Sequence, residues 1–153
     1  HATVVDGPDE SLQRVLDPSF DFREEVVLEQ TPSRWVEPSG EVIPGASAQI
    51  VDYQPNRVAV EVETPADGLL VLTDTYAPGW QVLLDGRSVP LYVANHAFRA
   101  VVVPDGSHCV TFAYRPNTFY VGAGLSLLSL LGLIVVGVRL LVPQRNHSAR
   151  LPQ

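Results

Sequence analysis

The chain has 153 residues, of which 46% are hydrophobic and 18% are charged, and its 10 basic and 17 acidic side chains give a net charge of −7. The apolar content excludes an intrinsically disordered chain, and the acidic balance without a basic stripe disfavours a nucleic-acid-binding protein. All of the acids lie at or before Asp105, whereas the residues after Arg115 carry three arginines as their only charges.

The first predicted element is a short amphipathic helix of about two turns within residues 6–18. Pro8 suits a first helical turn, and Asp9 and Glu10 suit the positive end of the helix dipole. Its apolar face would consist of Leu12, Val15 and Leu16. Residues 31–47 are rich in Pro, Ser and Gly and predict a loop, with Trp35 packed on the core.

From Val26 onward the apolar period changes to two, which predicts strands. Residues 57–63 alternate cleanly, with Val58, Val60 and Val62 facing inward. Residues 69–73 are apolar on both faces, as expected of a central strand. The strand candidates are residues 26–28, 48–53, 57–63, 69–73, 80–84, 88–93, 98–103 and 108–114.

Two Asp-Gly pairs, Asp85-Gly86 and Asp105-Gly106, are hairpin signals between apolar strands. Seven or eight short strands at this spacing predict a mainly β fold, an antiparallel β-sandwich of immunoglobulin-like or jelly-roll-like type. Cys109 is the single cysteine, so an internal disulfide and a cysteine metal cage are excluded. Its strand-like surroundings predict a small buried side chain.

Residues 119–138 contain no charge and are long enough, at about 1.5 Å per residue, to cross the hydrocarbon core. They predict one C-terminal transmembrane helix, with Phe119 and Tyr120 in an interfacial aromatic belt. The basic residues that follow favour a cytoplasmic C-terminus, which places the acidic body outside the cytoplasm. Because the chain begins at His1, lacks methionine and shows no signal peptide, we expect a C-terminal piece of a longer protein with upstream transmembrane helices.

The predicted organisation has five parts. They are a short helix and first strand (1–30), the Pro/Ser/Gly-rich loop (31–47), an extracytoplasmic β-sandwich (48–116), the transmembrane helix (117–142) and a basic cytoplasmic tail (143–153).

The sequence shows no catalytic or metal-binding motif, so we expect no catalytic residue, no metal ligand and no cofactor in this part. Asp74 and Asp85 flank a strand and could form a glycosidase pair, but acids are also typical of such turns. An aromatic and polar group near strand ends is a candidate glycan or peptide contact, and core packing is its alternative. The group consists of Tyr76, Trp80, Tyr92, His96 and Arg99.

The order of these segments resembles the C-terminal end of the YfhO-like bacterial membrane protein family. The resemblance is carried by residues 70–80, Asp85-Gly86, residues 94–101 and Tyr114-Arg115-Pro116 at the entry to a helix. It extends to the opening stretch from Leu12 to Val27. The residue after Tyr76 is often aromatic in the family and is alanine here, which weakens a continuous aromatic platform.

The resemblance implies a polytopic bacterial membrane protein related to GT-C glycosyltransferases. Such enzymes transfer a sugar from a polyprenyl-phosphate donor to an acceptor outside the cytoplasm, such as a cell-wall polymer. The family's catalytic acid is expected in an early extracytoplasmic loop, so this part of the chain would be accessory, structural or acceptor-binding. The alternative is a non-enzymatic β-sandwich tethered to the membrane as a binding module.

Overall fold

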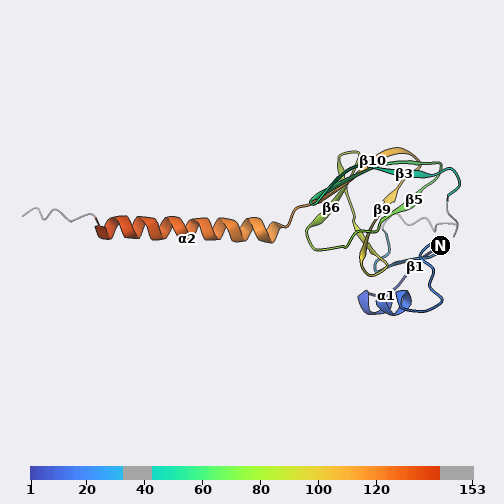
Figure 1. Ribbon diagram of the computed structural model, residues 1–153, viewed down its shortest axis with the longest axis horizontal. Coiled ribbons are helices and arrows are strands. Elements are labelled where there is room, and N and C mark those ends of the chain that lie inside the picture. Colours follow the sequence, from blue (N-terminus) through green and yellow to red (C-terminus); the bar gives the residue numbers. More distant parts are fainter. Residues whose placement is uncertain (33–42, 142–153) are drawn as a thin grey trace, which may run out of the picture. The chain divides into compact units, whose positions relative to one another are not determined.

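The computed structural model describes residues 1–32 and 43–141, which form two compact units that meet at Arg115 and Pro116 (Figure 1). The second unit contains α2 (Asn117–Leu141). The first unit contains a helix, α1 (Pro8–Val15), and the strands β1 (Ala2–Val4), β2 (Val26–Leu28), β3 (Ser47–Gln54), β4 (Arg57–Thr64), β5 (Gly68–Leu72), β6 (Trp80–Leu84), β7 (Arg87–Val89), β8 (Tyr92–Ala94), β9 (Phe98–Val103) and β10 (Gly106–Tyr114).

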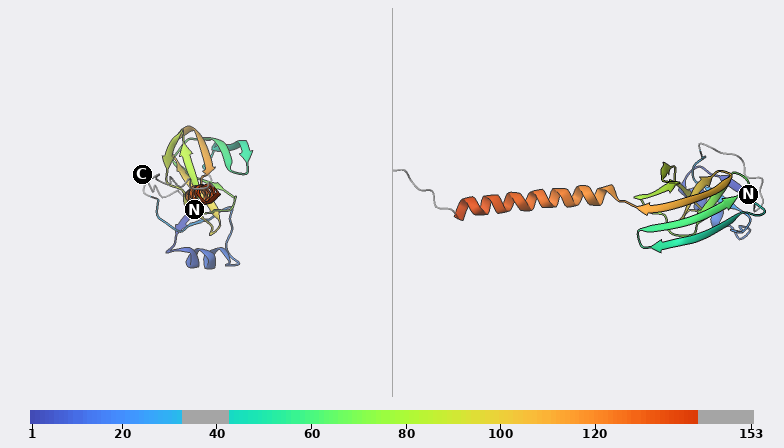
Figure 2. Two further views of the ribbon diagram at one scale, coloured as in Figure 1. Left: turned by 90° about the vertical axis from the view of Figure 1, so that its left-hand side faces the viewer. Right: turned by 90° about the horizontal axis from the view of Figure 1, so that it is seen from above.

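The ten strands form two five-stranded sheets, drawn from two further directions in Figure 2. The first sheet has the order β1-β2-β8-β9-β5 and the second β3-β4-β10-β6-β7. Neighbouring strands are antiparallel except β1 and β2, which are parallel. The mainly β, antiparallel sandwich with a short N-terminal helix and a C-terminal apolar helix is therefore confirmed.

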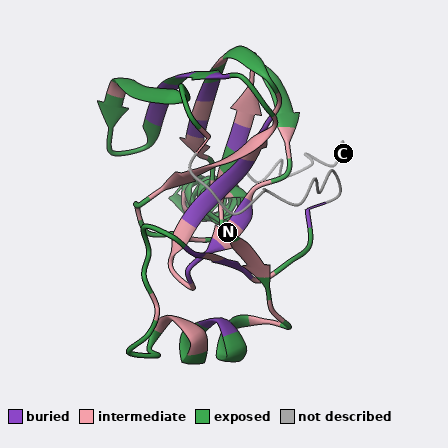
Figure 3. Cartoon of the chain, turned by 90° about the vertical axis from the view of Figure 1, so that its right-hand side faces the viewer, coloured by how far each residue is buried: buried purple, intermediate pink, exposed green. Residues whose placement is uncertain are grey.

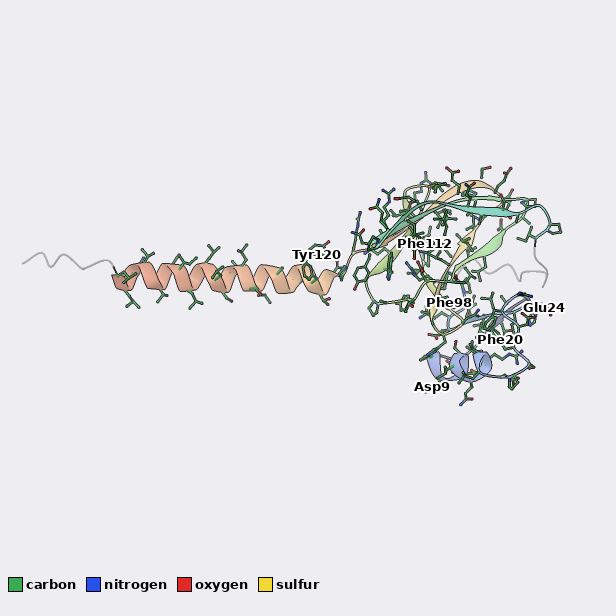
Figure 4. The ribbon with its side chains drawn as sticks, viewed as in Figure 1. Asp9, Phe20, Glu24, Phe98, Phe112 and Tyr120 are labelled. Carbon is green, nitrogen blue, oxygen red and sulfur yellow. The ribbon has the colours of Figure 1, made fainter. Side chains whose placement is uncertain are left out.

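The core between the sheets is built by alternate residues of the strands. The inward positions predicted for β4, Val58, Val60 and Val62, are all buried there. Phe112 on β10 is fully buried among them, and its side chain points into the sandwich (Figure 4). The remaining buried members are Val82, Val101, Val103 and Val110.

β5 is apolar on both faces, as predicted, but it lies at the edge of its sheet rather than at the centre. Leu70 and Leu72 pack against the core between the sheets. Leu69 and Val71 pack against a second cluster, on the opposite face of the first sheet, around Ala100. Both faces of β5 are thus half-buried, so its composition could not tell an edge strand from a central one.

The two Asp-Gly signals have different outcomes. Asp85 and Gly86 both have positive φ (49° and 78°) and join β6 to β7 in a two-residue hairpin, as predicted. Asp105-Gly106 was expected to be a second hairpin, and this is wrong, because β9 and β10 belong to different sheets. A turn signal predicts that the chain reverses locally, but it does not predict which strands pair with each other.

The strand predicted over 88–93 is divided in two. β7 pairs with β6 in the second sheet and β8 pairs with β9 in the first. The chain changes sheets at Pro90, which has no N–H to donate and therefore ends the β7 ladder.

The predicted helix α1 forms, but two of the three residues of its expected apolar face are exposed; Figure 3 colours the helix by burial. Ser11 is the fully buried residue, whereas Leu12 is exposed and Leu16 is 71% exposed. The reason is an ion pair: the Arg14 guanidinium donates to both carboxylate oxygens of the buried Glu25, at 3.1 and 2.5 Å. This anchor turns the Ser11 and Arg14 side of α1 toward β2.

Cys109 is exposed, contrary to the prediction of a buried side chain. β10 alternates, and because Val110 points into the core, Cys109 lies on the outer face. The prediction for Trp35 lies outside the described residues.

α2 runs for 25 residues from Asn117 to Leu141, which is about 37 Å at 1.5 Å per residue. Its side chains are exposed throughout, and its most apolar window has a mean hydropathy of 2.4. The hydroxyl of Ser129 donates to the Leu125 carbonyl at 3.0 Å, which satisfies it within the helix. In the described part of the chain, this is the helix that is long and apolar enough to cross a membrane.

Candidate functional site

A buried arginine lies at the centre of the candidate site. Arg99 shares the inward face of β9 with Val101 and Val103, so the strand carries its side chain into the core, where it is 2% exposed. The guanidinium carbon lies 3.8 Å from the ring centroid of Trp80 and 5.6 Å from that of Phe112. Aromatic faces attract a cation and replace part of the water that Arg99 loses.

Asp74 neutralises this arginine. Nη2 of Arg99 lies 2.9 Å from the Asp74 carboxylate, and its Nε donates to the Asp74 carbonyl at 3.4 Å. The hydroxyl of Tyr53 donates to both carboxylate oxygens, at 3.1 and 3.2 Å. We call these four side chains, Tyr53, Asp74, Trp80 and Arg99, the Arg99 cluster.

The electrostatics follow from this geometry. Burial lowers the pKa of Arg99 below its ordinary value, and the charge of Asp74 partly opposes the shift. The hydrogen bond to the Asp74 carboxylate raises the pKa of Tyr53, because the phenol must remain protonated to donate. Nη1 of Arg99 is buried without a hydrogen-bond partner among the described residues. The Asp74 carboxylate and the rings of Trp80 and Phe112 thus surround the charged Arg99 side chain.

The loop that carries Asp74 is fixed by backbone hydrogen bonds. The N–H of Tyr76 donates to the Ala97 carbonyl at 2.7 Å, which ties the loop to the β8–β9 turn. The N–H of Arg115 donates to the Gly79 carbonyl at 2.7 Å. The Trp80 ring then packs on Tyr114, with centroids 5.3 Å apart.

The structure separates the five predicted contact residues into three places. Trp80 and Arg99 come together in the Arg99 cluster, and Tyr76 lies on the same loop, 37% exposed. Tyr92 is buried in the second cluster, beside Ala100. They form no continuous aromatic platform among the described residues.

His96 occupies the third place, the β8–β9 turn. Both Asn95 and His96 have positive φ (48° and 65°), and the Asn95 side chain accepts the Val27 N–H at 2.8 Å. Nδ1 of His96 lies 3.5 Å from a carboxylate oxygen of Glu29, and both atoms are buried. The Asn95 contact holds the turn against β2, whereas the His96 side chain is 36% exposed and its Nδ1 has no hydrogen-bond partner among the described residues.

The sequence analysis missed two residues that contact the predicted site residues, Tyr53 and Glu29. It also missed the pairing of Asp74 with Arg99. An arginine on an inward strand position signals that an acid must neutralise it. The sequence offers many acids, and no periodicity selects Asp74 among them. Asp74 and Asp85, considered as a glycosidase pair, lie at opposite ends of β6 and have separate partners.

Asp85 forms a second ion pair, with His108 on β10. Nδ1 of His108 lies 2.7 Å from the Asp85 carboxylate, and Nε2 lies 3.2 Å from the Asp105 carbonyl. Both partners are acceptors only, so the doubly protonated imidazolium satisfies both contacts. The hydrogen bond to Asp85 raises the pKa of His108, and the same bond lowers the pKa of Asp85.

This pair predicts a pH dependence of stability. The contribution of His108 is full below its unfolded pKa of 6.5 and is lost as pH rises through its higher folded pKa. That of Asp85 is full above its unfolded pKa of 3.8 and is lost as pH falls through its lower folded pKa. The melting temperature of Asp85→Asn should therefore lie below that of the unmodified chain between these two values.

The difference between the two melting curves should shrink above neutral pH. Asparagine retains the turn preference and the acceptor for the Cys109 N–H, 2.9 Å away, so the charge is the main change. A difference in melting temperature that stays constant from pH 5 to pH 9 would contradict the pairing.

No three potential ligands among the His, Cys, Asp and Glu side chains of residues 1–32 and 43–141 are grouped to hold a metal ion. Besides the Arg14–Glu25 pair, the sandwich contains the ion pairs Asp74–Arg99 and Asp85–His108. The contacts at the candidate site are hydrogen bonds, an ion pair and cation–π stacking.

Comparison with known proteins identifies the family. The chain is 26% identical over 84 residues to the uncharacterized protein YfhO of Bacillus subtilis (strain 168), which covers 55% of this chain and 10% of that protein. No solved structure matches the chain. A family described as "Bacterial membrane protein YfhO" matches residues 42–126, from the segment before β3 into α2. The match spans more than half of the sequence, and the chain belongs to the YfhO family of bacterial membrane proteins.

Proposed function

We propose that this chain forms the extracytoplasmic β-sandwich and last membrane helix of a polytopic, glycosyltransferase-like membrane protein. The parent protein would transfer sugars from polyprenyl-phosphate donors to cell-envelope glycans. The sandwich, of which residues 48–116 form the larger part, would be an accessory part that is structural or binds the acceptor. Family membership supports the proposal, and the matched segment makes up only a tenth of the curated relative's length.

The observation that carries this proposal is the composition on either side of α2. The helix is apolar and exposed along its described length, so it requires lipid or other membrane helices around it. Arg139 lies in its last turn, and Arg145 and Arg150 follow in the sequence, whereas every acid precedes it. By the positive-inside rule, these charges support a cytoplasmic position for 143–153 and an extracytoplasmic position for the sandwich.

An accessory role is supported by the Arg99 cluster. A catalytic acid or base must reach a substrate, whereas Asp74 is engaged by Arg99 and Tyr53. Tyr76 is the exposed member of the predicted contact set and is the residue most accessible to an acceptor glycan. Arg99, which stacks on Trp80, and Tyr92 are both buried. Their burial favours the alternative function, a membrane-tethered, non-enzymatic module in the same position.

The sidedness is tested by Cys109, which is exposed and is the single cysteine of the chain. In intact cells that produce the full chain, a membrane-impermeant maleimide should label Cys109 without permeabilisation. Cys109→Ala is the matched control for labelling at other cysteines. A reporter at Ser148, introduced as Ser148→Cys in the Cys109→Ala background, should react only after permeabilisation. The reverse pattern would overturn the proposed orientation.

The two functional candidates are separated by activity of the complete membrane protein. Transfer from a polyprenyl-linked sugar, lost when the parent's own acidic loop residues are replaced, supports the transferase. Absence of transfer, with retained binding of the sandwich to envelope polymer, supports the tethered module.

A further inference from the structure

The chain connection fixes which end of the sandwich lies near the start of α2. β10 ends at Tyr114 and α2 begins at Asn117, so three residue steps separate them. At no more than about 3.6 Å per residue, this distance is at most about 11 Å. Because α2 is the membrane helix, Tyr114 lies within reach of the lipid headgroups for any tilt of the sandwich.

Hydrogen bonds bring other loops to the same end. The N–H of Tyr114 donates to the Asn56 carbonyl at 2.9 Å, in the turn between β3 and β4. Arg115 is bonded to Gly79, and Tyr76 to Ala97, as described above. We define the linker end as residues 53–57, 74–80, 95–97 and 114–115.

The linker end exposes two aromatic side chains with polar tips. Tyr53 is 63% exposed and Tyr76 is 37% exposed. Tyrosine suits the membrane interface, where its ring meets apolar chains and its hydroxyl meets water. Pro55, Asn56 and Pro78 are exposed around them.

The charges of the linker end suit phosphate. Asp74 pairs with Arg99 at 2.9 Å, Asp52 on the adjoining strand lies 3.7 Å from Arg57, and Glu29 lies 3.5 Å from His96. Arg57 keeps a half-exposed side chain, and Arg115 is exposed and adds positive charge. Guanidinium groups recognise phosphate oxygens well.

The opposite end of the sandwich is acidic. The turns there, 65–67, 85–86 and 104–106, carry Asp67, Asp85 and Asp105, of which Asp85 is paired with His108 and lies near Arg87. An anionic membrane surface therefore repels this end more than it repels the linker end. Chain connection, exposed tyrosines and charge thus all favour the same face.

We propose that the linker end rests on the phospholipid headgroup layer of the bilayer that α2 crosses. Tyr53 lies in the interface, and Arg57 and Arg115 bind lipid phosphates. This contact with the headgroup layer does not depend on which side of the membrane the sandwich occupies. The proposal can therefore be right or wrong independently of the proposed orientation.

The test uses nitroxide labels at the two ends of one sheet. In the Cys109→Ser background, Asn56→Cys places a label at the linker end and Ser107→Cys places one at the acidic end; both positions are exposed. Seven residue steps separate Ser107 from Tyr114 on β10, which is about 24 Å at 3.4 Å per step. The full chain is reconstituted in vesicles of phosphatidylcholine and phosphatidylglycerol with a nickel-chelating lipid.

Paramagnetic relaxation by the nickel lipid should be several-fold stronger at Asn56→Cys than at Ser107→Cys. Adding Arg57→Gln and Arg115→Gln should reduce the relaxation at Asn56→Cys, and more so in phosphatidylglycerol-containing vesicles than in pure phosphatidylcholine. Equal relaxation at the two labels overturns the proposal. So does a label at Asn56→Cys that neither nickel lipid nor water-soluble nickel reaches, because protein would then cover this end.

Discussion

Replacing Arg99 by alanine is expected to lower the free energy of unfolding of the sandwich by about 3 kcal/mol. The substitution leaves the Asp74 carboxylate without its cation and removes the guanidinium that packs between Trp80 and Phe112. Asp74 is 31% exposed and can be hydrated, which keeps the loss below that of a fully buried pair. Urea unfolding of the full chain in detergent, followed by near-ultraviolet circular dichroism, measures the change.

The matched control is Arg57→Ala on β4. Its ion pair with Asp52 is longer, at 3.7 Å, and its side chain is 55% exposed, so the loss should stay below about 0.5 kcal/mol. Equal small losses for the two variants would mean that Arg99 is retained for a ligand rather than for the fold.

Trp80→Ala should destabilise the sandwich by about 2–3 kcal/mol. The indole packs on Arg99 at 3.8 Å and on Tyr114 at 5.3 Å between centroids, and it also contacts the core between the sheets. Because Trp80 is half-buried, the loss should be smaller than for a fully buried tryptophan. Thermal unfolding of the full chain, monitored by near-ultraviolet circular dichroism, gives the value.

Tyr76→Ala, on the same loop, separates folding from binding. Tyr76 is exposed, so its removal should change the melting temperature little while weakening retention on envelope polysaccharide if the loop contacts glycan. If Trp80→Ala instead kept its melting temperature and lost that retention, Trp80 would be a ligand contact and its assignment to the fold would be wrong.

Local signals predicted the strands well where the side chains alternate. β4 is the clearest case, since Val58, Val60 and Val62 are buried as expected. Which strands pair with each other was harder to predict, because a turn at glycine reverses the chain equally well within a sheet or between sheets. The different outcomes of Asp85-Gly86 and Asp105-Gly106 illustrate this limit.

The candidate site was predictable in composition but not in geometry. Trp80 and Arg99 were identified from their place near strand ends, and they do meet. Tyr92 and His96 follow the same pattern in the sequence, yet they face a different cluster and a different acid. Which face a residue takes depends on the register of β8 with β9, and no local signal specifies that register.

The β-bulge in β3 affects how copies of the chain can associate in a crowded membrane. The register between β3 and β4 shifts between Ile50 and Asp52, so Val51 is an extra residue on an edge strand whose side chains are largely exposed. A regular edge of this length would offer a template for another chain, and confinement to a lipid plane raises the frequency of such encounters. The bulge bends the strand and interrupts the regular spacing of its backbone, which disfavours edge-to-edge pairing of neighbouring copies into extended sheets.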